Sequence, residues 1–229
     1  MPFTMTHLYI AKNIYKFSNI SIKDLSQFYL GTIAPDAVHN RANYKPEYKK
    51  LSHLYAGEEG WGKIANNDEW IENAINLLLN HRNSKNYDFI LGYCVHILSD
   101  VYNNIAVWTP LKQKYQLDYN GGFHQQESEK LDYGRLYQQE NEKIDIELAL
   151  ILDNKDDFWY YIEKSKAISL NDVIFEDEIE KQKENILYHW YKDKERQDIS
   201  SNKLITIQST MKFIEDASNF IIDKLACLL

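Results

Sequence analysis

Hydrophobic residues recur along most of the chain with the three-to-four-residue spacing that is typical of amphipathic helices. This pattern predicts a first helix over residues 5–17 and another that begins at Asn67 and continues to about His81. A further helix is expected after the Asn120-Gly121-Gly122 break. Four more helical segments are expected toward the C-terminus: 143–152, 157–167, 173–192 and 203–228.

The pattern is less regular between the first helix and Asn67. Ser21 and Asp24 have the spacing of a capping box, which predicts the start of a second helix. This helix is expected to end near Gly31, because Pro35 disfavours helical backbone in the residue before it. Residues 36–65 are interpreted as a long loop, and a loop of that length is more often functional than idle.

The most apolar segment is residues 86–105, which is hydrophobic on nearly all sides and is expected to form a central buried helix. His96 and Asp100 are conspicuous polar residues within it. Gly92 precedes them on the same face of the helix, and its missing side chain lets another element approach closely. The sequence therefore predicts an all-α fold in one domain over residues 1–229: a compact multi-helix bundle around the helix that carries His96 and Asp100.

The composition supports this fold and excludes some classes of binding partner. Only 8 Gly and 4 Pro occur in 229 residues, which argues against an all-β chain. The net charge of −8 argues against duplex nucleic acid as a partner. No stretch is apolar enough to cross a membrane and no signal peptide is visible, so a cytoplasmic protein is expected. Cys94 and Cys227 are interpreted as buried free thiols.

His96 and Asp100 stand four residues apart, so their side chains project from one face of the helix and can share one ion. The alternative is a His-Asp pair that is satisfied by hydrogen bonds. Imidazole and carboxylate groups elsewhere in the chain favour the metal, because zinc binds such mixtures of nitrogen and oxygen. These candidates are His7, Asp36, His53 and His124.

Four segments carry a resemblance to a known family. They are Thr6-His7-Leu-Tyr-Ile-Ala-Lys, Tyr29-Leu-Gly-Thr-Ile-Ala-Pro-Asp36-Ala-Val-His39, Lys50-Leu-Ser-His53-Leu and Leu91-Gly92-Tyr-Cys-Val-His96-Ile-Leu-Ser-Asp100. Their order resembles the zinc-dependent phospholipase C family, in particular its cytoplasmic bacterial branch, with single-strand-specific zinc nucleases as distant relatives. The resemblance implies a helical bundle that holds up to three zinc ions and hydrolyses phosphodiester or phospholipid headgroup bonds.

The resemblance also implies roles for individual residues. One zinc would be held by Asp36, His53, His96 and Asp100. Asp100 would reach a second ion together with His7, although the N-terminal tryptophan that completes this site in the family is missing here.

The family's third site is altered in this chain, because Ala106 replaces one of its histidines. His124 remains as a candidate ligand. An oxygen ligand for that site is expected from Glu127, Glu129, Asp132, Asn103 or Asn104.

The expected function is zinc-dependent hydrolysis of a phosphoester by metal-activated water, with one to three Zn²⁺ ions and Asp36 as general base. A small soluble phosphoester is favoured over a membrane surface, because neither the charge nor a basic amphipathic helix suits an interface. The alternative is a helical binding or regulatory protein that retains a structural metal site without catalysis. His39 is interpreted either as a ligand or its partner, or as a surface residue. His81 and His189 are expected to be plain surface residues.

Overall fold

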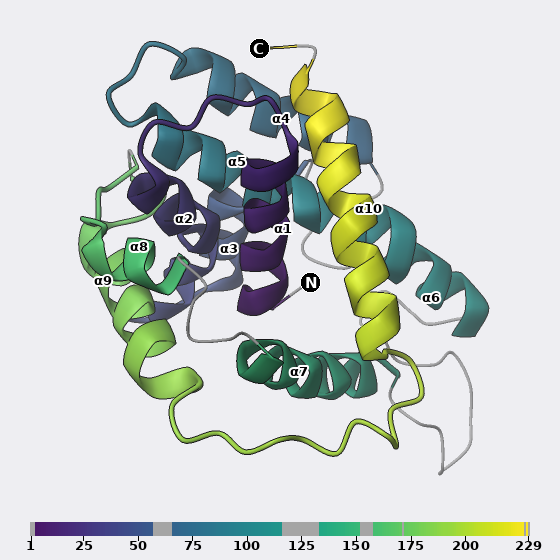
Figure 1. Cartoon of the computed structure of the whole chain (residues 1–229). Coiled ribbons are helices and arrows are strands. Elements are labelled where there is room, and N and C mark those ends of the chain that lie inside the picture. The colour runs from purple at the N-terminus through teal and green to yellow at the C-terminus, as the bar shows by residue number, and fades with distance from the viewer. Residues whose placement is uncertain are drawn as a thin grey trace.

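A computed structural model of the chain describes residues 3–56, 66–115, 133–151, 158–170, 172–226 and 228, and it confirms the all-α fold (Figure 1). The α-helices of the described residues are α1 (Thr4–Phe17), α2 (Leu25–Ile33), α3 (Pro46–Ser52), α4 (Asn67–Asn80), α5 (Tyr87–Asn103), α6 (Thr109–Tyr115), α7 (Tyr133–Ile151), α8 (Phe158–Lys164), α9 (Glu176–Asn185) and α10 (Ile207–Ala226). A 3₁₀ segment, η1 (Pro35–Asn40), follows α2, and π-helical segments η2 (Asn104–Trp108) and η3 (Ile186–Trp190) extend α5 and α9.

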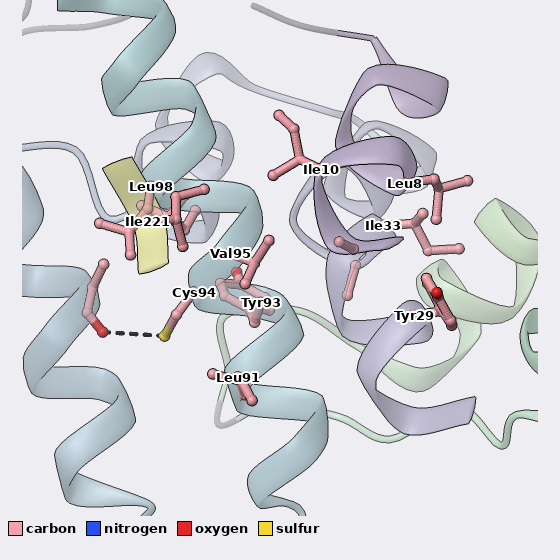
Figure 2. Close-up of a cluster of buried hydrophobic side chains, with 14 of the residues drawn as sticks. Leu8, Ile10, Tyr29, Ile33, Leu91, Tyr93, Cys94, Val95, Leu98 and Ile221 are labelled. Atoms are coloured by element: carbon pink, nitrogen blue, oxygen red, sulfur yellow. Dashed lines mark hydrogen bonds between the residues drawn. The ribbon is translucent and has the colours of Figure 1, made fainter. Parts of the chain in front are cut away.

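Helix α5 is the buried centre that its apolar sequence predicts. Every residue from Phe89 to Val101 is buried, and α1, α2, α4 and α10 all pack against this helix. Figure 2 shows apolar side chains of α5 next to those of α1, α2 and α10. On another side of α5, the Cys94 thiol donates a hydrogen bond to the Ala74 carbonyl of α4. Cys94 is a buried free thiol, as expected, whereas Cys227 lies outside the described residues.

Helices α2 and α5 cross with their backbones in direct contact. A Cβ atom added to Gly31 would lie 2.0 Å from the Phe89 carbonyl oxygen, and one added to Gly92 would lie 2.0 Å from the Phe28 carbonyl oxygen. Only glycine fits at both positions, because real Cβ atoms do not come this close to a carbonyl. The predicted close approach at Gly92 is therefore confirmed.

Two predictions about the segment after α1 are wrong. Asp24, not Ser21, caps α2, and its side chain accepts a hydrogen bond from the Gln27 N–H. The carboxylate of Asp88 also accepts the Asp24 N–H, and this contact fixes the turn before α2. Ala34 is helical despite the following Pro35 (φ −65°, ψ −39°), so the chain continues from α2 into η1 without an extended break.

Residues 36–65 are not one loop, because η1 and α3 occupy parts of this segment. Pro35 and Pro46 stand in the first turns of these helical segments, where a missing N–H leaves no hydrogen bond unmade. The segment predicted as a separate helix over 143–152 is the second half of α7. Helix α6 was not predicted.

Figure 1 shows α10 alongside α1, with α7 at the N-terminal end of α1. Buried carboxylates of α7 hold neighbouring backbone in place. The Asp145 carboxylate accepts hydrogen bonds from the Met5 N–H of α1 at 2.8 Å and from the Tyr191 hydroxyl at 2.5 Å. The Glu140 carboxylate accepts three backbone N–H groups of residues 203–205. Helix α7 is thus tied to the first turn of α1 and to the segment that leads into α10.

Candidate metal centre

Five of the candidate ligands converge on one buried place, although they come from four separate elements. His7 lies on α1, Asp36 on η1, His53 at the C-terminus of α3, and both His96 and Asp100 on α5. The three imidazoles and the Asp100 carboxylate are almost fully buried, whereas Asp36 keeps 19% of its side chain exposed.

The facing atoms are separated by distances that suit one small cation between them. Asp36 Oδ1 lies 3.2 Å from His53 Nε2, and Asp36 Oδ2 lies 3.9 Å from His96 Nε2. Asp100 Oδ2 lies 3.7 Å from His53 Nε2 and 3.8 Å from His96 Nε2. Tetrahedral zinc with bonds of about 2.0–2.1 Å separates its ligand atoms by roughly 3.3 Å. Small side-chain movements would therefore bring these four residues to ligating distance.

A second group lies on the other side of Asp100. His7 Nε2 is 3.7 Å from Asp100 Oδ1, and the His7 ring stacks on the His96 ring at 3.8 Å between centroids. The two oxygens of Asp100 thus face different imidazoles: Oδ1 faces His7, and Oδ2 faces His53 and His96.

Hydrogen bonds fix which nitrogen of each histidine carries the proton. His96 Nδ1 lies 2.8 Å from the Thr32 carbonyl, which can only accept, so this nitrogen is the donor. His7 Nδ1 lies 2.6 Å from Ser99 Oγ, and the single hydroxyl hydrogen of Ser99 goes to the His96 carbonyl. His7 Nδ1 must therefore donate to Ser99. In both rings Nε2 is left as a bare lone pair that faces Asp100.

His53 follows the same arrangement. Its Nδ1 lies 2.8 Å from Ser52 Oγ, whose hydrogen goes to the Lys49 carbonyl. With Nδ1 as the donor to Ser52, the Nε2 lone pair faces Asp36 and Asp100. A proton on Nε2 would instead make a hydrogen bond to Asp36 at 3.2 Å, so His53 is the one histidine of the centre with an alternative partner.

The convergence leaves buried acceptors facing one another. Four buried atoms of this centre have no hydrogen-bond partner among the described residues: His7 Nε2, His96 Nε2 and both oxygens of Asp100. Each unsatisfied buried polar atom costs about 1–3 kcal/mol. A cation beside each oxygen of Asp100 would remove this cost, because every one of the four atoms offers a lone pair. The donor set of imidazole nitrogen and carboxylate oxygen fits a zinc ion.

Electrostatics keeps most of the centre in its ligating form. Burial lowers the pKa of His7 and of His96, and it lowers the pKa of His53 to about 3, so the imidazoles are neutral. Burial alone would raise the pKa of Asp36, but the Lys49 ammonium opposes this effect, and the pKa of Asp36 lies well below its usual value. Asp36 is therefore ionised.

Asp100 behaves in the opposite way, because burial raises its pKa to about 8 when no cation is present. Ligation of a cation requires the carboxylate form. A metal ion and the proton therefore compete for Asp100.

The end of α3 sets the position of His53. Leu54 adopts left-handed backbone (φ 56°), and the N–H groups of Leu54 and Tyr55 return to the carbonyls of Leu51 and Lys50. This pattern terminates the helix at Ser52 and leaves His53 at the C-cap position. The Trp70 indole N–H donates to the His53 carbonyl at 2.7 Å, and this hydrogen bond ties the turn to α4.

The centre opens to solvent through Asp36. This residue lines a cavity of about 630 Å³, together with His39 and Lys49 beside it and the aromatic residues Trp108 and Tyr137. His39 Nε2 lies 3.8 Å from Asp36 Oδ1, and 43% of the His39 side chain is exposed. His39 is thus a residue of the cavity rim, outside the two buried groups of candidate ligands.

Other predicted residues lie elsewhere. His124, Glu127, Glu129 and Asp132 fall outside the described residues. Asn103 donates its amide to the Tyr137 hydroxyl at 2.9 Å, and its buried oxygen has no partner among the described residues. Asn104 donates to the side-chain oxygen of Asn67. His81 is half-buried, and its Nδ1 contacts the Leu77 carbonyl, whereas His189 is exposed and lines the cavity.

Sequence reasoning missed the residues that orient the candidate ligands. Ser52 and Ser99 each immediately precede a candidate ligand in the chain, but a serine at that position carries no signal by itself. The Thr32 carbonyl is backbone, so no side-chain pattern could have indicated it. Lys49 was missed because one lysine among 26 basic residues is not distinctive.

Comparison with known proteins agrees with this arrangement. Residues 6–102, a little under half of the chain, match the family described as zinc dependent phospholipase C. No curated protein and no solved structure gives a significant match. The matched segment contains all five residues that converge in the candidate centre. Over residues 6–102, the chain is therefore similar to the zinc dependent phospholipase C family.

Proposed function

We propose that this protein is a zinc-dependent hydrolase of phosphoesters. In this proposal four residues hold one zinc ion. The ligand atoms are a carboxylate oxygen of Asp36, Nε2 of His53, Nε2 of His96 and Oδ2 of Asp100. The observation that carries the proposal is the set of buried lone pairs that face one another without a partner among the described residues. Hydrogen bonding alone does not explain that set, because a proton on Asp100 could be donated to only one of the two bare nitrogens, and the 3.7 and 3.8 Å separations are too long for a hydrogen bond.

A second ion would be held by His7 and by Asp100 Oδ1. His96 cannot serve both ions, since its Nδ1 is committed to the Thr32 carbonyl and it has one free nitrogen. Asp100 can serve both, because its two oxygens face different imidazoles. His7 would need further ligands beyond Asp100, so this ion should be bound more weakly than the first. A third ion, at His124 with an oxygen ligand such as Glu127, belongs to the same proposal.

A bound zinc ion supplies a Lewis acid that activates water for attack on phosphorus. Asp36 has the catalytic role in this proposal. It is the partly exposed carboxylate of the centre, it lines the cavity, and its pKa is held low, so an ionised oxygen faces the place that a substrate would enter. That oxygen can accept a hydrogen bond from the attacking water and hold it in position.

The family match supports a phosphoester as the substrate class. Among the helices of the described residues, none has the length and apolar composition that a membrane crossing requires. The cavity walls are mixed polar and aromatic, which suits a small phosphodiester that enters from water. We therefore favour a small soluble phosphodiester and a cytoplasmic location.

The experiment measures zinc content and the hydrolysis of bis(p-nitrophenyl) phosphate by the full chain, with and without a chelator. We expect bound zinc, turnover that the chelator abolishes, and a loss of at least about 100-fold in His96→Ala, because even residues that only support a ligand contribute 10–100-fold. His81→Ala is the matched control, since His81 contacts the Leu77 carbonyl away from the centre.

Three other outcomes are informative. Wild-type protein that takes up no zinc, or turnover that survives His96→Ala, contradicts the proposal. Tightly held zinc without turnover on any phosphoester would instead favour a binding or regulatory protein with a structural metal.

A further inference from the structure

We propose that Lys49, oriented by His39, forms a binding subsite for phosphoryl oxygens at the mouth of the metal centre. This inference rests on the proposed function and deepens it, because it names the group that would hold the charged part of the substrate. The ligand class is a phosphate or phosphoester anion.

Lys49 is placed where such an anion would enter. Its ammonium nitrogen lies 3.6 Å from Asp36 Oδ1, and its side chain is 16% exposed. Lys49, His39 and Asp36 line the same cavity of about 630 Å³. An anion that approaches the candidate centre through this cavity would therefore pass within reach of the ammonium group.

His39 orients the lysine. Its Nε2 lies 3.1 Å from Lys49 Nζ, and an ammonium can only donate, so His39 accepts with a neutral ring. Burial and the nearby lysine lower the pKa of His39, which agrees with this assignment. The contact uses one of the three N–H groups of Lys49, and Asp36 at 3.6 Å is beyond a normal hydrogen bond. Donors remain for an incoming oxygen.

Lys49 should have opposite effects on the binding of a metal cation and on the binding of a phosphate anion at this place. Its positive charge repels a metal ion and competes for Asp36, so it weakens metal binding. The same charge attracts a phosphoryl oxygen, and a charge-assisted hydrogen bond is stronger than a neutral one. A residue that merely supported the metal centre would affect both ions in the same direction. This difference allows a direct test.

The test measures the binding of two probes, inorganic phosphate and dimethyl phosphate, by titration calorimetry on full-length protein, both zinc-loaded and chelator-treated. The variant Lys49→Met keeps the length of the side chain and removes the charge, with Lys49→Gln as a second variant should the first fail to fold. Lys45→Met is the matched control, because it removes the same charge from an exposed position that does not line the cavity. Zinc affinity is measured on every protein by competition with a chromophoric chelator.

We expect Lys49→Met to bind phosphate about tenfold or more weakly, to bind zinc at least as tightly as wild type, and Lys45→Met to behave as wild type in both. If Lys49→Met binds both probes more weakly, the subsite serves substrate and product. If it binds only inorganic phosphate more weakly, the subsite serves a doubly charged phosphate. Both outcomes support the inference. Unchanged binding of both probes overturns it, as does a parallel loss of zinc and phosphate.

Failure of the proposed function would be seen separately. If wild-type protein took up no zinc, phosphate binding that depended on Lys49 in metal-free protein would still support the subsite. Equal phosphate binding by metal-free wild type and Lys49→Met would overturn it.

Discussion

At the scale of single residues, the candidate centre depends on groups outside the set of candidate ligands. Ser99 and the Thr32 carbonyl accept the Nδ1 protons of His7 and His96, and Ser52 does the same for His53. Each contact both orients a ring and leaves its Nε2 as the free lone pair. The chemical identity of a ligand thus comes partly from its neighbour.

Replacing Ser99 with alanine tests this dependence. The change leaves His7 Nδ1 without its acceptor, so the ring can rotate or move its proton to Nε2. We expect the affinity for the zinc ion at His7 to fall about 10–100-fold, as for other residues that support ligands, while the ion at His53 and His96 stays bound. Chelator competition measures both affinities.

Ser218→Ala provides the control, because Ser218 is also a buried serine whose hydroxyl donates to a helix carbonyl, here that of Ile214, but on α10. Zinc affinities in Ser99→Ala that equal those of the control would show that Ser99 does not set the His7 tautomer.

At the scale of elements, the crossing of α2 and α5 determines the geometry of the centre. Gly31 and Gly92 let the two backbones touch, and this contact brings the Thr32 carbonyl to His96 Nδ1. The chain then continues directly from α2 into η1, which carries Asp36. A wider separation of the helices would displace a ligand and the acceptor that orients another.

Gly92→Ala should therefore damage stability and metal binding together. Its Cβ would meet the Phe28 carbonyl oxygen at 2.0 Å, and backbone on both helices would have to move. We expect the free energy of unfolding of metal-free protein to fall by about 3 kcal/mol, measured by urea denaturation. Zinc affinity should fall as well.

A second substitution on α5 tests whether any change in this buried helix would have the same effect on stability and zinc affinity. Cys94 faces α4, and Cys94→Ala removes one sulfur without adding an atom. We expect a loss of about 1 kcal/mol and unchanged zinc affinity. A Gly92→Ala protein as stable as Cys94→Ala would contradict the close-approach argument.

At the scale of the whole molecule, α7 connects distant parts of the chain through buried carboxylates. Asp145 joins the first turn of α1 to Tyr191, and Glu140 holds residues 203–205 ahead of α10. Burial raises the pKa of Asp145 to about 7, although its two hydrogen bonds oppose the shift. Its protonation is therefore linked to the stability of the fold.

The sign of this linkage can be measured with Asp145→Asn. Folded Asp145 holds a proton up to about pH 7, whereas an unfolded aspartate loses it near pH 3.9. The stabilising contribution is thus complete below pH 3.9 and lost as pH rises through 7. The amide side chain of this variant cannot titrate, and it can still bond to the Met5 N–H and to the Tyr191 oxygen.

We expect the stability of wild type relative to Asp145→Asn to fall by about 3 kcal/mol between pH 4.5 and 8. Urea denaturation at several pH values, with chelator present, measures this difference, and the other titrating groups cancel because both proteins contain them. A difference that is constant with pH would show that Asp145 has an ordinary pKa.

The sequence alone determined the helical class, the buried helix with His96 and Asp100, and the identity of five converging residues. Local rules suffice for the first two, because hydrophobic periodicity and the i, i+4 spacing act within one helix. For the others the ordered motifs of the family were needed. Local rules failed at Ala34 and over residues 36–65, where tertiary contacts stabilise helical turns that a short stretch does not indicate. The single-domain organisation stays a prediction.

Only the tertiary structure decided which atoms face one another. The tautomer of His7 depends on Ser99, 92 residues away, and the orientation of His96 depends on a carbonyl 64 residues away. The position of Lys49 beside Asp36 and His39 likewise follows from the packing of α3 against η1. Such contacts are set by how helices cross, and hydrophobic patterns specify which face of a helix is buried but not which atom it meets there.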